Sequence, residues 1–228
     1  MPVGTFVNAA AIVVGGFIGL LFRGFIPERI TKTIMQVLGI FTASLGIKML
    51  LAGRQDLVIL VSLVLGALIG ELLQIEDAIE RLGKKADELA HSQGEGIGRG
   101  FVPTTLLYCV GSMAIVGSLT EGVTGDARIL LTKAVIDGIA SIAFAATLGY
   151  GVLFASIPIL VYQGGMTVLA RYLQPVMAGP VINEVSATGG FILLLLSLNM
   201  LEIKKVRVAN LLPALIIVAV AMLIKTRM

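Results

Sequence analysis

Residues 108–138 read YCVGSMAIVGSLTEGVTGDARILLTKAVIDG, and the organisation of the whole chain can be worked out from them. Two apolar segments meet at a short polar turn, and the second carries both Lys133 and Asp137. An ionised side chain near the middle of a membrane-spanning helix costs roughly 2.5 to 3.5 kcal/mol. Residues four apart share one helix face and can partly neutralise each other. The pair has two interpretations: a structural ion pair that ties helices together, or the lining of a solute or ion path.

The composition of the 228 residues indicates an integral membrane protein. The chain is 57% hydrophobic and 14% charged, and its mean hydropathy is +1.00. This leaves too little polar surface for a soluble globule of this length. Since a spanning helix needs about 20 mostly apolar residues, we expect an all-α, polytopic transmembrane bundle of about eight helices. Residues 1–228 should form a single membrane domain.

Apolar segments long enough to cross a membrane recur along the chain. Helices are predicted because backbone polar groups in lipid must be satisfied internally. The first lacks an early Lys or Arg, so we interpret it as a retained helix and not a signal peptide. The fifth and sixth are separated only by the turn at 149–151. The eight predicted segments are 3–22, 33–52, 56–74, 103–120, 129–148, 151–171, 184–201 and 209–226.

The only substantial polar region, residues 75–100, predicts an amphipathic helix followed by a Gly-rich link. The single histidine, His91, lies there without Cys or carboxylate at ligand spacing, so we expect no metal site. With eight crossings, one side of the membrane receives ten Lys and Arg residues and the other five. The positive-inside rule then places the amphipathic helix in the cytoplasm and both termini outside. We also expect a homo-oligomer.

A helix, charged turn, helix pattern recurs, and GGFI occurs at both Gly15 and Gly189. If the repeating unit is three helices, residues 1–74 and 101–171 form inverted copies, with 172–228 as a terminal helix pair. Inverted repeats build many secondary transporters, whose substrate sites lie near the midplane at interrupted helices. The alternative is that duplication gives a symmetric bundle whatever its function. We expect interruptions at Pro158 and at Gly179–Pro180.

Polar side chains on separate predicted helices fall at similar depths, which predicts a shared site. Glu121 is set aside because it lies at a boundary turn. No catalytic, nucleotide-binding or nucleic-acid-binding motif occurs, so we expect neither an enzyme nor a cofactor nor a nucleic-acid partner. The candidate substrate-binding residues are Asn8, Ser112, Lys133, Asp137, Gln163, Asn183 and Glu184.

Several strings resemble those of the uncharacterised bacterial membrane-protein family typed by YqgA and YdfK. They are CVGSMAIVGSLTEGVTGD at 109–126, LLTKAVIDG at 130–138, YQGG, NLLPAL, the GTFVNAAAIVVGG opening and GELLQIEDAIERLG. The resemblance covers essentially the whole chain and implies a bacterial inner-membrane protein, but it brings no activity. GTFVN and GGFIGLLFR are also similar to fragments of small fluoride-channel proteins, although the Thr- and Phe-rich stretch of those channels is missing.

Two functions follow from these observations. The first is a transporter or channel for a small ion or polar solute, with the lipid bilayer as its surroundings. In such a transporter, Lys133 neutralises an anionic group of the solute or pairs with Asp137, and Asp137 carries a coupling proton or cation. The second is a membrane scaffold or regulator that acts through the amphipathic segment, in which the buried charges only fix packing.

Overall fold

The computed structural model describes residues 2–79, 81, 97–174 and 179–227. Within these ranges the regular elements are helices, which confirms the all-α prediction. Seven of them are long and apolar enough to cross a membrane, or eight if the bent pair α5 and α6 is one span. Residues 75–79 and 81 are helical, but the rest of the predicted amphipathic helix, including His91, lies outside the described residues. The elements are α1 (Val3–Arg23), α2 (Glu28–Leu50), α3 (Asp56–Leu73), α5 (Ile97–Val110), α6 (Ser112–Thr124), α7 (Arg128–Leu148), α8 (Gly151–Phe154), α9 (Ser156–Val168), α10 (Ala170–Leu173), α11 (Gly179–Met200), η1 (Val208–Leu211) and α12 (Pro213–Arg227).

The chain forms two compact units that do not follow the order of the sequence. The first unit comprises Met1–Met35, Ile79–Cys109 and Met113–Gln174. The second comprises Gln36–Ala78, Val110–Ser112 and Pro175–Met228. Helix α1 therefore belongs with α7 and α9, whereas α3 belongs with α11 and α12. The division into consecutive three-helix segments stays a prediction.

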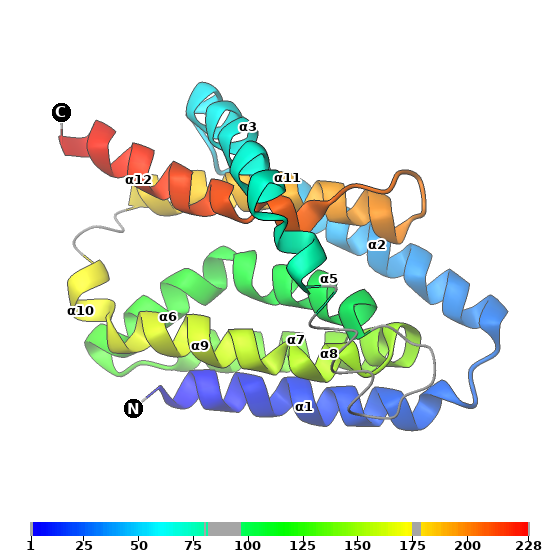
Figure 1. The fold of residues 1–228 in the computed structure, drawn as a ribbon. Coiled ribbons are helices and arrows are strands. Elements are labelled where there is room, and N and C mark those ends of the chain that lie inside the picture. Colours follow the sequence, from blue (N-terminus) through cyan, green and yellow to red (C-terminus); the bar gives the residue numbers. More distant parts are fainter. Residues whose placement is uncertain (1, 80, 82–96, 175–178, 228) are drawn as a thin grey trace. The chain divides into compact units, whose positions relative to one another are not determined.

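In the first unit, α1 and α7 lie side by side and run in the same direction (Figure 1). Gly4 faces Leu130 near the start of both helices, and Gly19 faces Ala146 near their ends. Between them, a Cβ added to Gly15 would meet the backbone oxygen of Gly138. The small residues of α1 thus let the two backbones approach closely, as is typical of membrane helix pairs.

Helices α5 and α6 meet at Gly111 and are bent by 57°. At the start of α5, the Ile97 oxygen lies where a Cβ on Gly151, just beyond the end of α7, would point. Near the end of α6, Glu121 contacts Gly4. The bent pair therefore runs the length of α7 in the opposite direction. The predicted segment 103–120 is one broken span.

The chain has a helix break three residues before Pro158, because α8 ends at Phe154 and α9 begins at Ser156. Pro158 itself is in the first turn of α9. Gly179 and Pro180 are the first residues of α11, and the interruption expected there adjoins residues outside the described ranges, so it stays a prediction. A first-turn proline removes no hydrogen bond that the helix needs. The predicted separation of the fifth and sixth segments is confirmed, since α7 ends at Gly149, whose φ is +82°.

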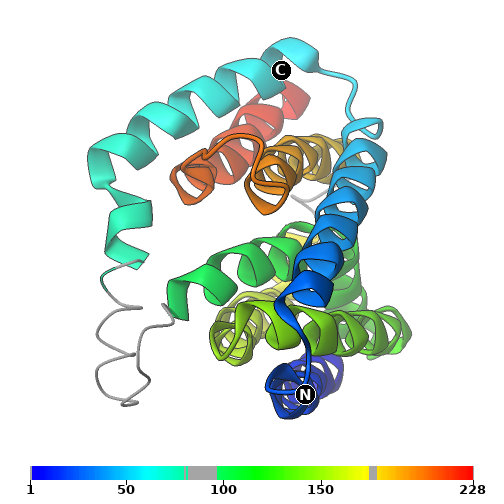
Figure 2. The same cartoon turned by 90° about the vertical axis from the view of Figure 1, so that its right-hand side faces the viewer.

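In the second unit, α3 packs against η1 and α12, and Figure 2 shows the cyan helix beside the C-terminal helices coloured orange to red. A Cβ on Gly70 would meet the backbone oxygen of Asn210, and one on Gly66 would meet the backbone of Ala214. Gly46 of α2 likewise faces the backbone of Gly190 in α11. Glycines spaced by four residues thus hold helices together in this unit as well.

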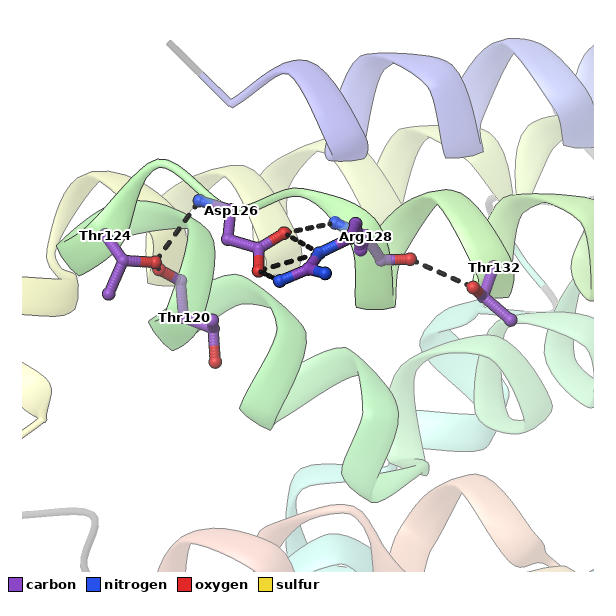
Figure 3. A network of polar contacts seen from close by, with 5 residues as sticks. All are labelled: Thr120, Thr124, Asp126, Arg128 and Thr132. Atoms are coloured by element: carbon purple, nitrogen blue, oxygen red, sulfur yellow. Dashed lines mark hydrogen bonds and ion pairs between the residues drawn. The ribbon is translucent and has the colours of Figure 1, made fainter.

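The polar turn between α6 and α7 is held by its own side chains (Figure 3). The Asp126 carboxylate accepts hydrogen bonds from Arg128 Nε at 3.0 Å and Nη2 at 2.6 Å. The Asp126 backbone N–H donates to Thr124 Oγ1 at 3.2 Å, and Gly125 between them has a φ of +78°. This turn reverses the chain outside the apolar segments and fixes where α7 begins.

Candidate functional site

Several polar side chains are buried in the first unit, and six of them, from four helices, form a set that we call the polar core. Each is at most 6% exposed. Helix α7 contributes three of them at intervals of four residues, which places them on one face. The polar core consists of Asn8 on α1, Tyr108 on α5, Lys133, Asp137 and Ser141 on α7, and Gln163 on α9.

The centre of the polar core is an ion pair. Lys133 Nζ donates a hydrogen bond to Asp137 Oδ2, as their spacing predicts, and both side chains are buried. Lys133 Nζ also lies 5.7 Å from the centroid of the Tyr108 ring, within the range of a cation–π attraction. The opposite charges make the centre formally neutral, which reduces the cost of burying them.

Asn8 joins the ion pair to α9. Its Nδ2 donates to Asp137 Oδ2 at 3.1 Å and to Gln163 Oε1 at 3.3 Å. Asn8 Oδ1 and Gln163 Nε2 are buried and have no hydrogen-bond partner among the described residues. One acceptor and one donor of the polar core are therefore unpaired within this part of the chain.

Tyr108 and Ser141 extend the polar core along α7, and sequence reasoning missed both. The Tyr108 hydroxyl and Ser141 Oγ are 2.8 Å apart. Ser141 could have been found, because it follows Lys133 and Asp137 at the same four-residue spacing. Tyr108 could not, since its contact depends on how α5 packs against α7.

The other three predicted site residues belong to the second unit. Glu184 is 2% exposed, and its carboxylate accepts the backbone N–H groups of Arg54 at 2.8 Å and Gln55 at 3.3 Å. These N–H groups belong to the start of α3, where a negative charge is favoured. Asn183 is exposed, and Ser112 is half-buried at the break between α5 and α6. The structure thus brings together Asn8, Lys133, Asp137 and Gln163, but places Glu184 in a helix cap.

Glu121, which the sequence suggested was only a boundary residue, is buried in the first unit at 5% exposure. Its Oε1 accepts the backbone N–H of Gly4 at 2.8 Å, at the start of α1. Its Oε2 is buried and has no hydrogen-bond partner within the ranges that the structure describes. No local signal identifies such a residue, because its partner is 117 positions away.

The side chains of the polar core differ in kind from the usual ligands of a metal centre. Among the described residues, no three His, Cys, Asp or Glu side chains group together as metal ligands would. The polar core instead offers one cation, one anion, one free amide donor and one free amide acceptor. Such groups bind and orient a solute through charge and hydrogen bonds.

Comparison with known proteins agrees with the membrane character of the chain. It is 31% identical over 218 residues to "Uncharacterized membrane protein YdfK" of Bacillus subtilis (strain 168), covering 94% of this chain and 93% of that protein. It is 32% identical over 222 residues to "Uncharacterized protein YqgA" of Escherichia coli (strain K12), covering 95% and 94%. No significant match to a solved structure was found. Residues 3–223 match the family described as "Protein of unknown function (DUF554)", and the chain belongs to this family.

Proposed function

We propose that the protein is a transporter or channel for a small ion or polar solute, and that the polar core is its binding site. The observation that carries the proposal is the pair of unpartnered buried atoms, Asn8 Oδ1 and Gln163 Nε2, beside the ion pair. An unsatisfied buried polar group costs about 1 to 3 kcal/mol. An ion pair that only ties helices together does not need a free donor and a free acceptor next to it. A solute that both donates and accepts hydrogen bonds would satisfy both.

The roles of the side chains follow from their contacts. Asn8 and Gln163 orient the solute through their free atoms, while Lys133 and Asp137 complement charges on it and neutralise each other when it is absent. Helices α1, α7 and α9 supply these groups, so a relative movement of any one would change the site. No chemical conversion is assigned to it. Ser112, Asn183 and Glu184 lie in the second unit and are not needed for this site.

The direction of the helices supports the predicted topology. Helices α1 and α7 run the same way, with α2, α3 and the bent pair between them in the chain. If α2 and α3 each cross once, the bent pair must also cross once. Eight crossings then put both termini on one side, which the Lys and Arg distribution makes the outside. We include the bacterial inner membrane, the inverted repeats and a homo-oligomer in the proposal.

Osmotic relaxation of proteoliposomes tests the function. Liposomes holding purified protein are shocked with urea, glycine, potassium chloride or potassium acetate, and light scattering follows the entry of each probe. At least one probe should enter faster than in protein-free liposomes, and Asp137→Asn should abolish the difference. Asp126→Asn is the matched control, since it removes an exposed carboxylate and should leave the rate unchanged. Protein-free rates for all four probes, or a wild-type rate in Asp137→Asn, would contradict the proposal.

The alternative, a scaffold or regulator that acts through residues 75–100, depends mainly on residues outside the described ranges. Deleting residues 84–100 separates the two functions. A transporter should keep measurable entry of the probe after the deletion, whereas a scaffold should lose its cellular phenotype and show no entry in either form.

A further inference from the structure

The first unit holds a second buried acidic residue, Glu121, about one helical turn along α1 from the polar core. Glu121 contacts Gly4, and Asn8 of the polar core follows Gly4 by four residues, or about 6 Å of helix. Asp137 has an ammonium group and an amide as partners. Glu121 has one backbone N–H and forms no ion pair with another described residue. An acidic residue within a membrane-spanning segment marks an ion or proton pathway more often than a structural feature.

Charged groups on the neighbouring elements do not neutralise Glu121. On α7, Lys133 is bound to Asp137 and Arg128 to Asp126. On α10, which contacts α6 near Gly122, Arg171 is exposed. The partner of the Glu121 carboxylate among the described residues is therefore the N–H at the start of α1 and not a side-chain cation. Its second oxygen is left available to a cation.

A buried hydroxyl group on α6 also lacks a partner among the described residues. Ser118 precedes Glu121 by three residues, so both lie on one face of α6, and its Oγ forms no hydrogen bond with a described residue. A Cβ added to Gly4 would lie 3.2 Å from Glu121 Oε2 and against Leu130, which places Oε2 between α1, α6 and α7. One acidic oxygen and one hydroxyl oxygen on the same face of α6 are thus unpartnered within the described part of the chain.

We propose that Glu121 is the binding site for a small monovalent metal cation, Na⁺, whose movement is coupled to that of the solute. The coupling rests on the proposed function, whereas cation binding does not. A single carboxylate suits a monovalent cation, because divalent ions recruit several carboxylates. Asp137 is then part of the solute site, and the coupling role expected for it belongs to Glu121.

Infrared difference spectroscopy on protein in lipid nanodiscs tests the binding without any need for transport. Sodium chloride is added at constant pH, with potassium chloride as the ionic-strength control. Isotope labelling of glutamate separates its bands from those of aspartate. We expect sodium to shift a glutamate carboxylate band. The Glu121→Gln variant should lose the change that the wild type shows.

Glu184→Gln is the matched control, because Glu184 already gives its carboxylate to two backbone N–H groups. The cation-dependent band should survive in this variant. Glu71→Gln, a substitution of an exposed residue, is a second control for the case that Glu184→Gln folds poorly, and it should also keep the band. A buried cap with a purely structural role would give no cation-dependent band. The proposal is overturned if sodium changes no glutamate band in the wild type, or if Glu121→Gln leaves that change intact.

Transport then tests the coupling. In proteoliposomes with an imposed sodium gradient, Glu121→Gln should reduce gradient-driven probe uptake by about tenfold, a typical coupling factor. Probe exchange without a gradient should stay close to the wild-type rate. A cation-dependent band without probe entry would overturn the proposed function but not the cation site. Probe entry without a band would overturn the cation site alone.

Discussion

The two units bury carboxylates in different ways. In the second unit, Glu184 accepts two backbone N–H groups at the start of α3. In the first unit, Asp137 depends on a side-chain ammonium and an amide, and one oxygen of Glu121 has no partner among the described residues. Backbone donors cannot be exchanged without unfolding a helix end, so Glu184 acts as a permanent cap. Partners on separate side chains, or partners that are missing, leave groups that can bind a ligand.

Glycine packing, by contrast, is common to both units. Gly15 of α1 and Gly70 of α3 each lie against the backbone of another helix. The units therefore differ in their buried polar groups and not in how their helices pack. This is the reason for placing function in the first unit.

The largest expected effect comes from separating the ion pair. Lys133→Met leaves Asp137 buried without a counter-charge, which should lower the free energy of unfolding by about 3 to 5 kcal/mol. The double variant Lys133→Met, Asp137→Leu should recover most of that loss, because it removes both charges. Unfolding in detergent, followed by circular dichroism, measures both. A single variant as stable as the wild type would show that the pair does not contribute to packing.

Glycine substitutions test whether the two units pack alike. Gly15→Ala and Gly70→Ala should each lower the free energy of unfolding by about 1 to 3 kcal/mol, since the methyl group has no space. Gly165→Ala is the control, because an added Cβ there meets no atom within 4 Å. Thermal unfolding compares the three. A loss confined to one of the two tested glycines would break the similarity between the units.

The same substitution at the two buried glutamates should have unequal effects. In Glu184→Gln an amide NH₂ replaces an oxygen that accepts a backbone N–H, so we expect a loss of about 0.5 to 2 kcal/mol, as for other helix caps. In Glu121→Gln the amide oxygen can keep Gly4, and the NH₂ replaces an atom without a partner. The free energy of unfolding of Glu121→Gln should therefore stay within about 0.5 kcal/mol of the wild-type value. Equal losses in a thermal shift assay would remove the distinction between the two residues.

The smallest expected effect lies in the exposed turn. The hydrogen bonds from Arg128 hold the pKa of Asp126 at about 2, below its ordinary value of 3.8. A lowered pKa in the folded state means that this contribution to stability is present above pH 3.8 and disappears as the pH falls towards 2. Asp126→Asn should lose this acid dependence. The difference in melting temperature between wild type and variant, measured through that range, should be small, because exposed pairs contribute little.

Much of the fold could be predicted because hydrocarbon leaves the backbone few choices. Apolar runs of the right length had to be helices, and the four-residue spacing of Lys133 and Asp137 required that they face each other. The break at Gly111 was not predicted, and the break expected at Pro158 lies three residues before it, between α8 and α9. A glycine or proline changes a helix according to its position in the turn and its neighbours, which an apolar run does not show.

The sequence by itself determined the helical membrane class, the approximate spans and the ion pair, since these depend on hydropathy and on residues within one turn of each other. Only the tertiary structure decided that Asn8 meets both Asp137 and Gln163. It also decided that Glu121 contacts Gly4 while Glu184 caps α3. These contacts join residues more than a hundred positions apart in most cases, as in the 129 between Asn8 and Asp137. They arise from which helices pack together, and small residues anywhere along an apolar helix can permit that packing.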